Sequence, residues 1–379
     1  MLAYLMNQPG ELVRDHVPDP VCGADEVILQ TEAVSVCSTD ISYYRDHLIP
    51  EAWPIIPGHE YVGRVLEVGP ELGSAVAVGD RLTYWGQTDF GGLAEYRSLR
   101  PLFPGQNPGR EKVWHTERNF YDAEQAAAVV VPPEMSSSSV TLTEPLISVM
   151  RSILVNPPRP GSKVIMLGAG PSALLALQVL TRCMGVGPTV VIDRNQDRLE
   201  IARRLGATQT FNTQSEADEL EAFVRDNKDH YAEYVFDALP HVEVDAYGTD
   251  VREMAMMLLW PGSTYVVYGA TSMLQSIRTW LILAKGLKVQ AAPFDVRAFP
   301  MSRTAHVAQT ALGLVRHGVI DVDALLTGSA DFDRPESVYA VFDHYGEGLS
   351  LKTSIAFPAR GEHGSRRMAE VTGEPASDL

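Results

Sequence analysis

The hydrophobic pattern divides the chain into two kinds of segment. From Met1 to about Gly92, short apolar runs alternate with Pro and Gly, which is typical of β-strands joined by turns. Candidate strands lie at Glu26–Val36, at Tyr61–Val68 and within Gly79–Tyr84. Many short strands separated by turn residues predict a barrel-like β domain.

From about Pro160 the pattern changes to alternating strands and helices. Six apolar runs of strand length are separated, in most cases, by helix-length segments, which predicts a doubly wound parallel sheet. The predicted strands are Val164–Leu167, Thr189–Ile192, Thr208–Phe211, Tyr234–Asp237, Thr264–Val267 and Leu287–Ala291, and the predicted helices are Pro171–Met184, Arg198–Leu205, Ser215–Val224 and Val251–Trp260.

The segments around these two regions are less regular. Pro101–Pro133 carries two Pro-Gly pairs and a polar run, and we interpret it as a loop-rich insertion. It either shapes a substrate pocket or an oligomer contact, or it is a surface loop. The polar tail Ala359–Leu379 is predicted to be disordered. The remaining predicted elements are a helix at Thr143–Leu154, a helix at His306–His317 and a final strand at Leu351–Phe357.

A glycine-rich turn joins the first strand of the parallel sheet to its helix. Gly168 allows a tight turn, Gly170 lets a ligand approach the backbone, and the helix beginning at Pro171 and Ser172 offers N–H groups to a phosphate. The next strand ends in Asp193, at about the spacing of an acid that takes the ribose hydroxyls of NAD. A carboxylate there favours NAD over NADP, because it repels a 2′-phosphate, although the adjacent Arg194 weakens that preference.

Chain length, net charge and cysteine content limit the domain organisation, the partners and the compartment that we expect. A chain of 379 residues predicts two domains, and a net charge of −17 argues against nucleic acid and anionic membranes as partners. Three scattered cysteines are too few for a disulfide framework and fit a reducing compartment. The N-terminus lacks the features of a signal peptide, and no charge-free stretch reaches membrane-spanning length. We therefore expect a cytoplasmic protein with a small-molecule substrate.

Three dispersed residues offer sulfur, nitrogen and oxygen to one zinc ion: Cys37, His59 and Glu144. A catalytic zinc needs three protein ligands and one open position, and it lets an alcohol lose its proton near neutral pH. Thr39 is placed to accept that proton, and Asp40 to accept the N–H of His59. Each residue alone also has a structural explanation, such as a small buried cysteine. Spacing alone leaves both interpretations open.

An ordered set of motifs resembles the zinc-containing medium-chain dehydrogenase/reductase family, with the polyol (sorbitol) dehydrogenase subgroup most similar. The resemblance runs from Met1 to Phe357 and implies an α/β protein with a GroES-like β-barrel catalytic domain plus a Rossmann doubly wound parallel sheet. It implies a catalytic domain at 1–151 and 293–379, an NAD-binding domain at 152–292, and a homodimer or homotetramer. The motifs are Cys37–Asp40, Pro57–Gly63, Val78–Arg81, Gly92–Tyr96, Thr143–Leu146 and Leu167–Pro171.

The resemblance also implies roles for single residues. Cys37 and His59 correspond to zinc ligands, either Glu60 or Glu144 supplies the third, and Thr39 relays the proton. Tyr43, Trp85 and Trp114 are candidate walls of the substrate pocket, or ordinary core residues. Many relatives bind a structural zinc through four cysteines; we expect none here, because Leu82–Thr143 contains no cysteine. The residues implied to bind the cofactor are Gly168, Gly170, Pro171, Ser172, Asp193, Arg198, Tyr268, Gly269, Ala270 and Lys352.

Together these observations predict an oxidoreductase with one catalytic zinc that transfers a hydride between NAD(H) and a secondary alcohol or ketone. The resemblance favours a polyol, cyclitol or sugar-like substrate. A redox-neutral lyase or epimerase that keeps its nicotinamide bound is the nearest alternative. A non-catalytic NAD-binding protein is disfavoured, because it needs no Lewis acid. A zinc-free reductase is the third alternative, and metal analysis distinguishes it.

Overall fold

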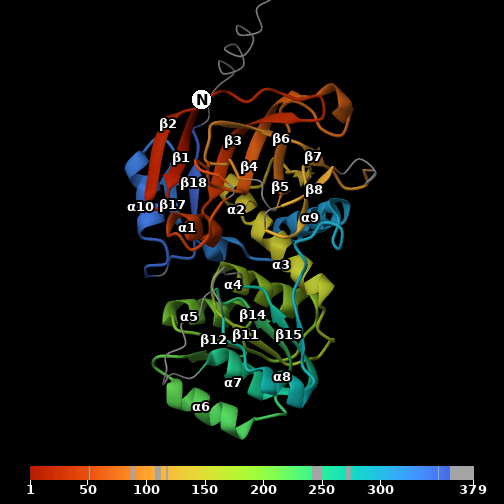
Figure 1. The fold of residues 1–379 in the computed structure, drawn as a ribbon, viewed down its shortest axis with the longest axis vertical. Coiled ribbons are helices and arrows are strands. Elements are labelled where there is room, and N and C mark those ends of the chain that lie inside the picture. The colour runs from red at the N-terminus through yellow and green to blue at the C-terminus, as the bar shows by residue number, and fades with distance from the viewer. Residues whose placement is uncertain are drawn as a thin grey trace, which may run out of the picture.

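The computed structural model describes residues 1–50, 52–86, 90–106, 112–116, 118–240, 250–269, 275–348 and 350–358. They form a β-rich lobe and an α/β lobe, with the helix α3 (Thr143–Val155) at the junction (Figure 1). This arrangement confirms the predicted fold class, a β-barrel lobe combined with a doubly wound parallel sheet. The tail at 359–379 lies outside the described residues.

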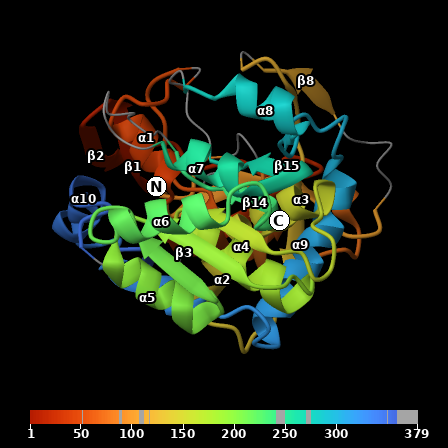
Figure 2. The ribbon, with the colours of Figure 1, turned by 90° about the horizontal axis from the view of Figure 1, so that it is seen from below.

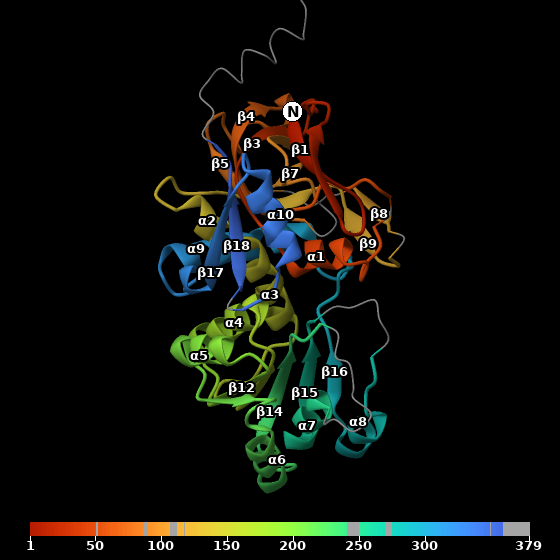
Figure 3. The same ribbon diagram turned by 90° about the vertical axis from the view of Figure 1, so that its left-hand side faces the viewer.

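The β-rich lobe is organised by a mixed eight-stranded sheet. Its strand order is β17-β18-β3-β4-β5-β10-β7, and β6 also pairs with β3. The C-terminal strand β18 pairs with β3, so that Ile355 lies opposite Val34 and the two ends of the chain build one lobe (Figure 3). The strands of this lobe are β1 (Leu2–Gln8), β2 (Glu11–His16), β3 (Val27–Ser35), β4 (Glu60–Val68), β5 (Arg81–Trp85), β6 (Tyr96–Leu99), β7 (Pro101–Leu102), β8 (Val113–His115), β9 (Tyr121–Ala123), β10 (Ala126–Val130), β17 (Leu326–Asp331) and β18 (Lys352–Ala356).

The α/β lobe contains a six-stranded sheet in which every pair is parallel. Side chains of β11 alternate between its faces: Val164 and Met166 join the core on one side, and Ile165 and Leu167 join the core on the other. Helices cover both faces (Figure 2). The strands, in spatial order, are β13 (Gln209–Asn212), β12 (Thr189–Asp193), β11 (Val164–Leu167), β14 (Ala232–Asp237), β15 (Leu259–Val267) and β16 (Lys288–Gln290).

The helices lie close to most of the predicted ranges. The predicted helix Pro171–Met184 is an α-helix that continues as a π-helical turn, Val179–Cys183. Four short helices, α1, α2, α8 and α10, were not predicted. The α-helices are α1 (Ser38–Tyr44), α2 (Ser137–Thr141), α3, α4 (Pro171–Gln178), α5 (Gln196–Leu205), α6 (Ala217–Asp226), α7 (Val251–Leu258), α8 (Thr279–Lys285), α9 (Met301–Arg316) and α10 (Pro335–Asp343), and 3-10 turns lie at Pro70–Leu72 and Asp323–Leu325.

Two predictions of secondary structure are wrong in part. Pro101–Pro133 is not merely a loop-rich insertion, because β10 pairs antiparallel with β5 inside the main sheet. Most of β10 is buried, so it lacks the polar alternation that identifies a half-exposed strand. The helix predicted at Val251–Trp260 ends at Leu258, where the ammonium group of Lys285 binds the carbonyl oxygens of Met256, Met257 and Leu259.

Candidate active site

Cys37 lies where β3 passes into α1. It precedes the first residue of that helix, and the carboxylate of Asp40 accepts a hydrogen bond from its backbone N–H at 2.9 Å. The side chain of Asp40 is fully buried. This local turn fixes the direction in which the Cys37 side chain leaves the backbone.

His59 and Glu60 enter the same region from the start of β4. Glu60 lies opposite Ser35 in the β3–β4 pair, so pairing of these strands brings the two segments together. Gly58 has φ of +94°, and a Cβ there would lie 2.8 Å from Val34 Cγ1, so only glycine fits this turn. The N–H of Gly58 donates to Asp40 Oδ1 at 2.8 Å. One buried carboxylate therefore joins the Cys37 and His59 segments.

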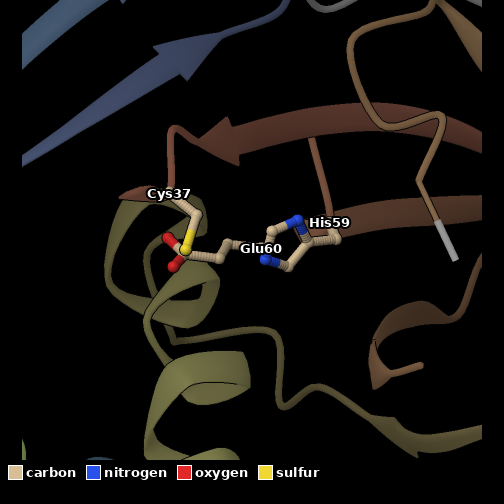
Figure 4. A group of neighbouring side chains, drawn as sticks. All are labelled: Cys37, His59 and Glu60. Carbon is tan, nitrogen blue, oxygen red and sulfur yellow. The ribbon is translucent and has the colours of Figure 1, made fainter. Parts of the chain in front are cut away.

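Cys37, His59 and Glu60 converge on one point. Each offers a ligand atom, and these atoms all lie within 4.8 Å of one another (Figure 4). His59 Nδ1 and Glu60 Oε2 are buried without a hydrogen-bond partner. Unpaired buried polar atoms are costly, and this set of one sulfur, one nitrogen and one oxygen donor suits zinc. The residues present therefore fit a zinc ion.

Nearby charged groups shift the pKa values of Cys37 and His59. Burial raises the pKa of the Cys37 thiol, but Lys352 and His59 outweigh burial and hold that pKa at about 6. Burial lowers the pKa of His59, yet the Asp40 carboxylate, 3.8 Å from His59 Nδ1, raises it well above its usual value. The expected hydrogen bond between Asp40 and His59 is not formed, because 3.8 Å exceeds hydrogen-bond distance. The Cys37 thiol is close to the deprotonated form that binds metals.

Lys352 lies against the predicted ligands. Its ammonium group pairs with Glu60 Oε1 in a fully buried ion pair. Burial lowers the pKa of Lys352, but the acidic groups of Glu60 and Cys37 outweigh burial and raise it. The contact of Lys352 with the cofactor phosphates stays a prediction, since the side chain is here committed to Glu60.

Glu144 stands beside this group rather than within it. It lies in the first turn of α3 and is buried, and burial raises its pKa to about 7. Its carboxylate accepts a hydrogen bond from Ser148 Oγ at 3.4 Å, and Trp85 Nε1 donates to Ser148 at 2.7 Å. Glu60 is thus the carboxylate that the structure brings to Cys37 and His59.

The glycine-rich turn lies at the carboxyl end of β11. Gly168 has φ of +93°, and a Cβ added to Gly170 would meet no atom within 4 Å, so the backbone there is open to a ligand. Pro171 and Ser172 form the first turn of α4. Asp193 accepts the N–H of Ala169 at 2.6 Å and that of Asn195 at 2.8 Å.

The other predicted cofactor residues lie in two places. Arg198 donates to the carbonyl of Ser350 at 2.9 Å. Tyr268 and Gly269 follow β15, and their N–H groups donate to the carbonyl of Asp237 at 2.8 and 2.9 Å. Ala270 lies outside the described residues. Whether these groups bind the cofactor stays a prediction.

A buried network of polar side chains at the end of β14 was not predicted from the sequence. The carboxylate of Asp237 accepts from Arg252 Nε at 2.6 Å and from Tyr265 at 2.8 Å. Arg252 also donates to the carbonyl oxygens of Leu239 and Pro240 and to Oε1 of Gln275, so it links the segments that follow β14 and β15. Because Arg252 lies in a helix and Tyr265 in a strand, no local pattern points to this contact.

Thr39, the predicted proton relay, and the three predicted pocket residues are spread over α1, β5 and β8. The Cys37 thiol donates to Thr39 Oγ1 at 3.7 Å, so the hydroxyl lies next to a predicted ligand. Tyr43 is buried on α1, Trp85 is buried beside Arg151, and Trp114 on β8 is 38% exposed. Their contact with a substrate stays a prediction.

Two protein-family models match this chain. Residues 23–101 match the alcohol dehydrogenase GroES-like domain, and residues 173–297 match the zinc-binding dehydrogenase. L-threonine 3-dehydrogenase of Burkholderia vietnamiensis is 29% identical over 225 residues, which are 57% of this chain and 63% of that enzyme. The chain thus matches slightly less than two thirds of the length of this curated relative.

Solved structures with the same fold are more distant in sequence. An alcohol dehydrogenase from Escherichia coli CFT073, crystallised with NADH, has a TM-score of 0.73 at 21% identity, over 94% of this chain and 99% of that one. Galactitol-1-phosphate dehydrogenase from Escherichia coli has a TM-score of 0.73 at 18% identity, over 94% and 100% of the two chains. The two family models together span more than half of the sequence. The chain therefore belongs to the zinc-containing medium-chain dehydrogenase/reductase family, as its motifs predicted.

Proposed function

We propose that this protein is a zinc-dependent dehydrogenase that transfers a hydride between a nicotinamide dinucleotide and a secondary alcohol or its ketone. The convergence of Cys37, His59 and Glu60 carries the proposal, since their ligand atoms lie within 4.8 Å of one another. A glycine-rich strand–turn–helix unit on the same chain supplies the expected site for the dinucleotide. One chain thus combines a Lewis-acid site with a place for the hydride carrier.

Cys37, His59 and Glu60 would hold the zinc ion, with Glu144 beside them. When bound, zinc supplies Lewis acidity, which lowers the pKa of an alcohol. The Thr39 hydroxyl, 3.7 Å from Cys37 Sγ, would accept the alcohol proton and pass it on. Asp40 holds the Cys37 and Gly58 backbones, which fixes the positions of the two ligand segments.

The cofactor that we propose is NAD(H) rather than NADP(H). Asp193 lies at the end of β12 with its carboxylate against the backbone of the glycine turn, where an adenosine ribose would lie. A negative charge there repels the 2′-phosphate of NADP. Arg194, directly after it, would instead favour NADP(H).

We propose a polyol or sugar-like secondary alcohol as the substrate. Two relatives support a substrate with several polar groups, because their names specify L-threonine and galactitol 1-phosphate. Tyr43 remains a candidate wall, because its ring meets Phe90, and the ring of Phe90 meets His59.

We also propose that two or more copies associate through the edge of the parallel sheet. β16 is the last strand of that sheet, and all three of its residues are exposed. On the neighbouring α8, Trp280 is 68% exposed and Leu283 is 75% exposed. An unpaired edge beside exposed apolar side chains favours pairing with another copy.

A coupled assay tests the proposed activity. The purified protein is mixed with NAD and a panel of secondary alcohols, and NADH formation is followed by absorbance. We expect net NADH formation, loss of turnover in His59→Ala, and unchanged NADH binding by that variant. Conversion of a substrate without net NADH would instead support the redox-neutral alternative. NAD binding without any turnover would support a non-catalytic protein.

A further inference from the structure

Arg118 reaches from the turn between β8 and β9 to the helix that follows Cys37. Its Nη2 donates a hydrogen bond to the hydroxyl oxygen of Tyr43, and its Cζ lies 5.6 Å from the centre of the Tyr43 ring. This hydrogen bond links the turn between β8 and β9 to α1. The Pro101–Pro133 segment therefore contributes a cation to the neighbourhood of the candidate active site.

A short chain of aromatic rings connects Arg118 to a predicted zinc ligand. The ring of Tyr43 meets Phe90 edge-on at 5.5 Å, and Phe90 meets the imidazole of His59 edge-on at 5.0 Å. Tyr43 is buried, whereas Arg118 is exposed. Arg118 thus lies at the solvent-exposed end of a row of side chains whose other end is His59, a predicted zinc ligand.

The positive charge of Arg118 is not neutralised where the structure describes its surroundings. Burial raises the pKa of Tyr43, so the hydroxyl that accepts its hydrogen bond is neutral. Among the described residues no carboxylate forms an ion pair with Arg118. By contrast Arg297, which lies over Tyr121 of the same hairpin, pairs with Asp295 at 2.8 Å. Within the part of the chain that the structure describes, this guanidinium therefore keeps a positive charge with no carboxylate partner, in a protein whose net charge is −17.

We propose that Arg118 recognises an anionic substituent, a carboxylate or a phosphate monoester, on the alcohol substrate. This inference rests on the proposed dehydrogenase function and narrows its substrate class. A guanidinium binds either anion through two parallel N–H donors, and such charge-assisted bonds are stronger than neutral ones. The Tyr43 hydroxyl and ring hold the guanidinium in place, so less side-chain entropy is lost when an anion binds.

Matched substrates test this recognition. Sorbitol is compared with sorbitol 6-phosphate, and butan-2-ol with 3-hydroxybutyrate, by kcat/KM for NADH formation and by equilibrium dialysis in the presence of NADH. We expect the protein to prefer one anionic member over its neutral counterpart by at least about 10-fold, the size of one charge-assisted hydrogen bond. The two pairs distinguish phosphate from carboxylate.

Three variants separate recognition from a structural role. Arg118→Gln should remove the preference mainly through KM, Arg118→Lys should keep much of it, and neither should change the Kd of NADH. Arg316→Gln is the control, because that arginine is half-exposed and pairs with Glu134 on another face. If Arg118→Gln lowers activity on neutral and anionic alcohols equally, Arg118 merely anchors the hairpin and the inference fails.

The same measurements distinguish the two proposals. Equal use of neutral and anionic alcohols by the unmodified protein would overturn the inference while leaving the dehydrogenase function intact. If no alcohol yields NADH, the proposed function fails. The dialysis result then decides the inference alone, since preferential anion binding that needs Arg118 would support it and equal binding would overturn it.

Discussion

Replacing Asp40 should weaken the zinc site, although Asp40 is not itself a predicted ligand. Its buried carboxylate accepts the N–H groups of Cys37 and Gly58 at 2.9 and 2.8 Å, and it lies 3.8 Å from His59 Nδ1. Asp40→Ala leaves both N–H groups without an acceptor. An unsatisfied buried donor costs about 1–3 kcal/mol, so we expect a loss of roughly 2–6 kcal/mol in the free energy of unfolding.

Asp40→Asn removes the negative charge of the side chain but keeps part of its hydrogen bonding. Its amide oxygen keeps one acceptor, so the loss of stability should be about half that of Asp40→Ala, roughly 1–3 kcal/mol. Both variants should bind zinc about 10- to 100-fold more weakly, because the two ligand segments lose their common anchor. Urea unfolding of the metal-free protein measures the first effect, and competition with a chromophoric chelator measures the second.

Asp343→Ala is the matched control for Asp40. Asp343 is exposed and accepts one hydrogen bond, from the hydroxyl of Tyr44 at 2.7 Å, so its removal should change stability little and zinc affinity not at all. Wild-type zinc affinity in Asp40→Ala would refute the reasoning, since the ligand segments would then keep their geometry without the buried carboxylate.

Four other predictions concern the α/β lobe. Asp193→Ala should weaken NAD binding relative to NADP; a wild-type protein that already prefers NADP in equilibrium titrations would contradict this assignment. Gly269→Ala should destabilise the protein by about 1–3 kcal/mol in urea, because its Cβ would lie 1.9 Å from the carbonyl oxygen of Leu239. Gly170→Ala, whose Cβ meets no atom, should instead keep its stability and lose NADH affinity. Trp280→Glu combined with Leu283→Glu should yield monomers in sedimentation velocity, and an unchanged oligomer would place the interface elsewhere.

The central strands of the parallel sheet were predictable because they are buried on both faces. β11 has the predicted bounds, since its four apolar residues are enclosed by a polar segment and a glycine turn. β10 was missed for a related reason: a buried run of Ala and Val carries no periodicity that separates strand from loop. The short helices α1, α2, α8 and α10 give too few turns for an apolar stripe to be recognised.

The candidate site could be predicted in its residue types but not in all of its contacts. Cys37, His59 and Glu60 have the chemistry of zinc ligands, and pairing of β3 with β4 brings them together. Lys352 and Glu60 are 292 residues apart along the chain, so their ion pair depends on β18 joining the sheet beside β3. Arg118 lies in a segment with no recognisable motif, and its contact with Tyr43 follows from tertiary structure alone.

X-ray absorption at the zinc edge, combined with elemental analysis, tests the central claim most directly. The claim is that Cys37, His59 and Glu60 hold a single zinc ion. We expect one zinc per chain, with one sulfur neighbour at about 2.3 Å and nitrogen or oxygen neighbours at about 2.0–2.2 Å. Cys37→Ser should remove the sulfur signal. Zinc-free protein that still oxidises an alcohol, or a bound zinc without a sulfur neighbour, would contradict the account.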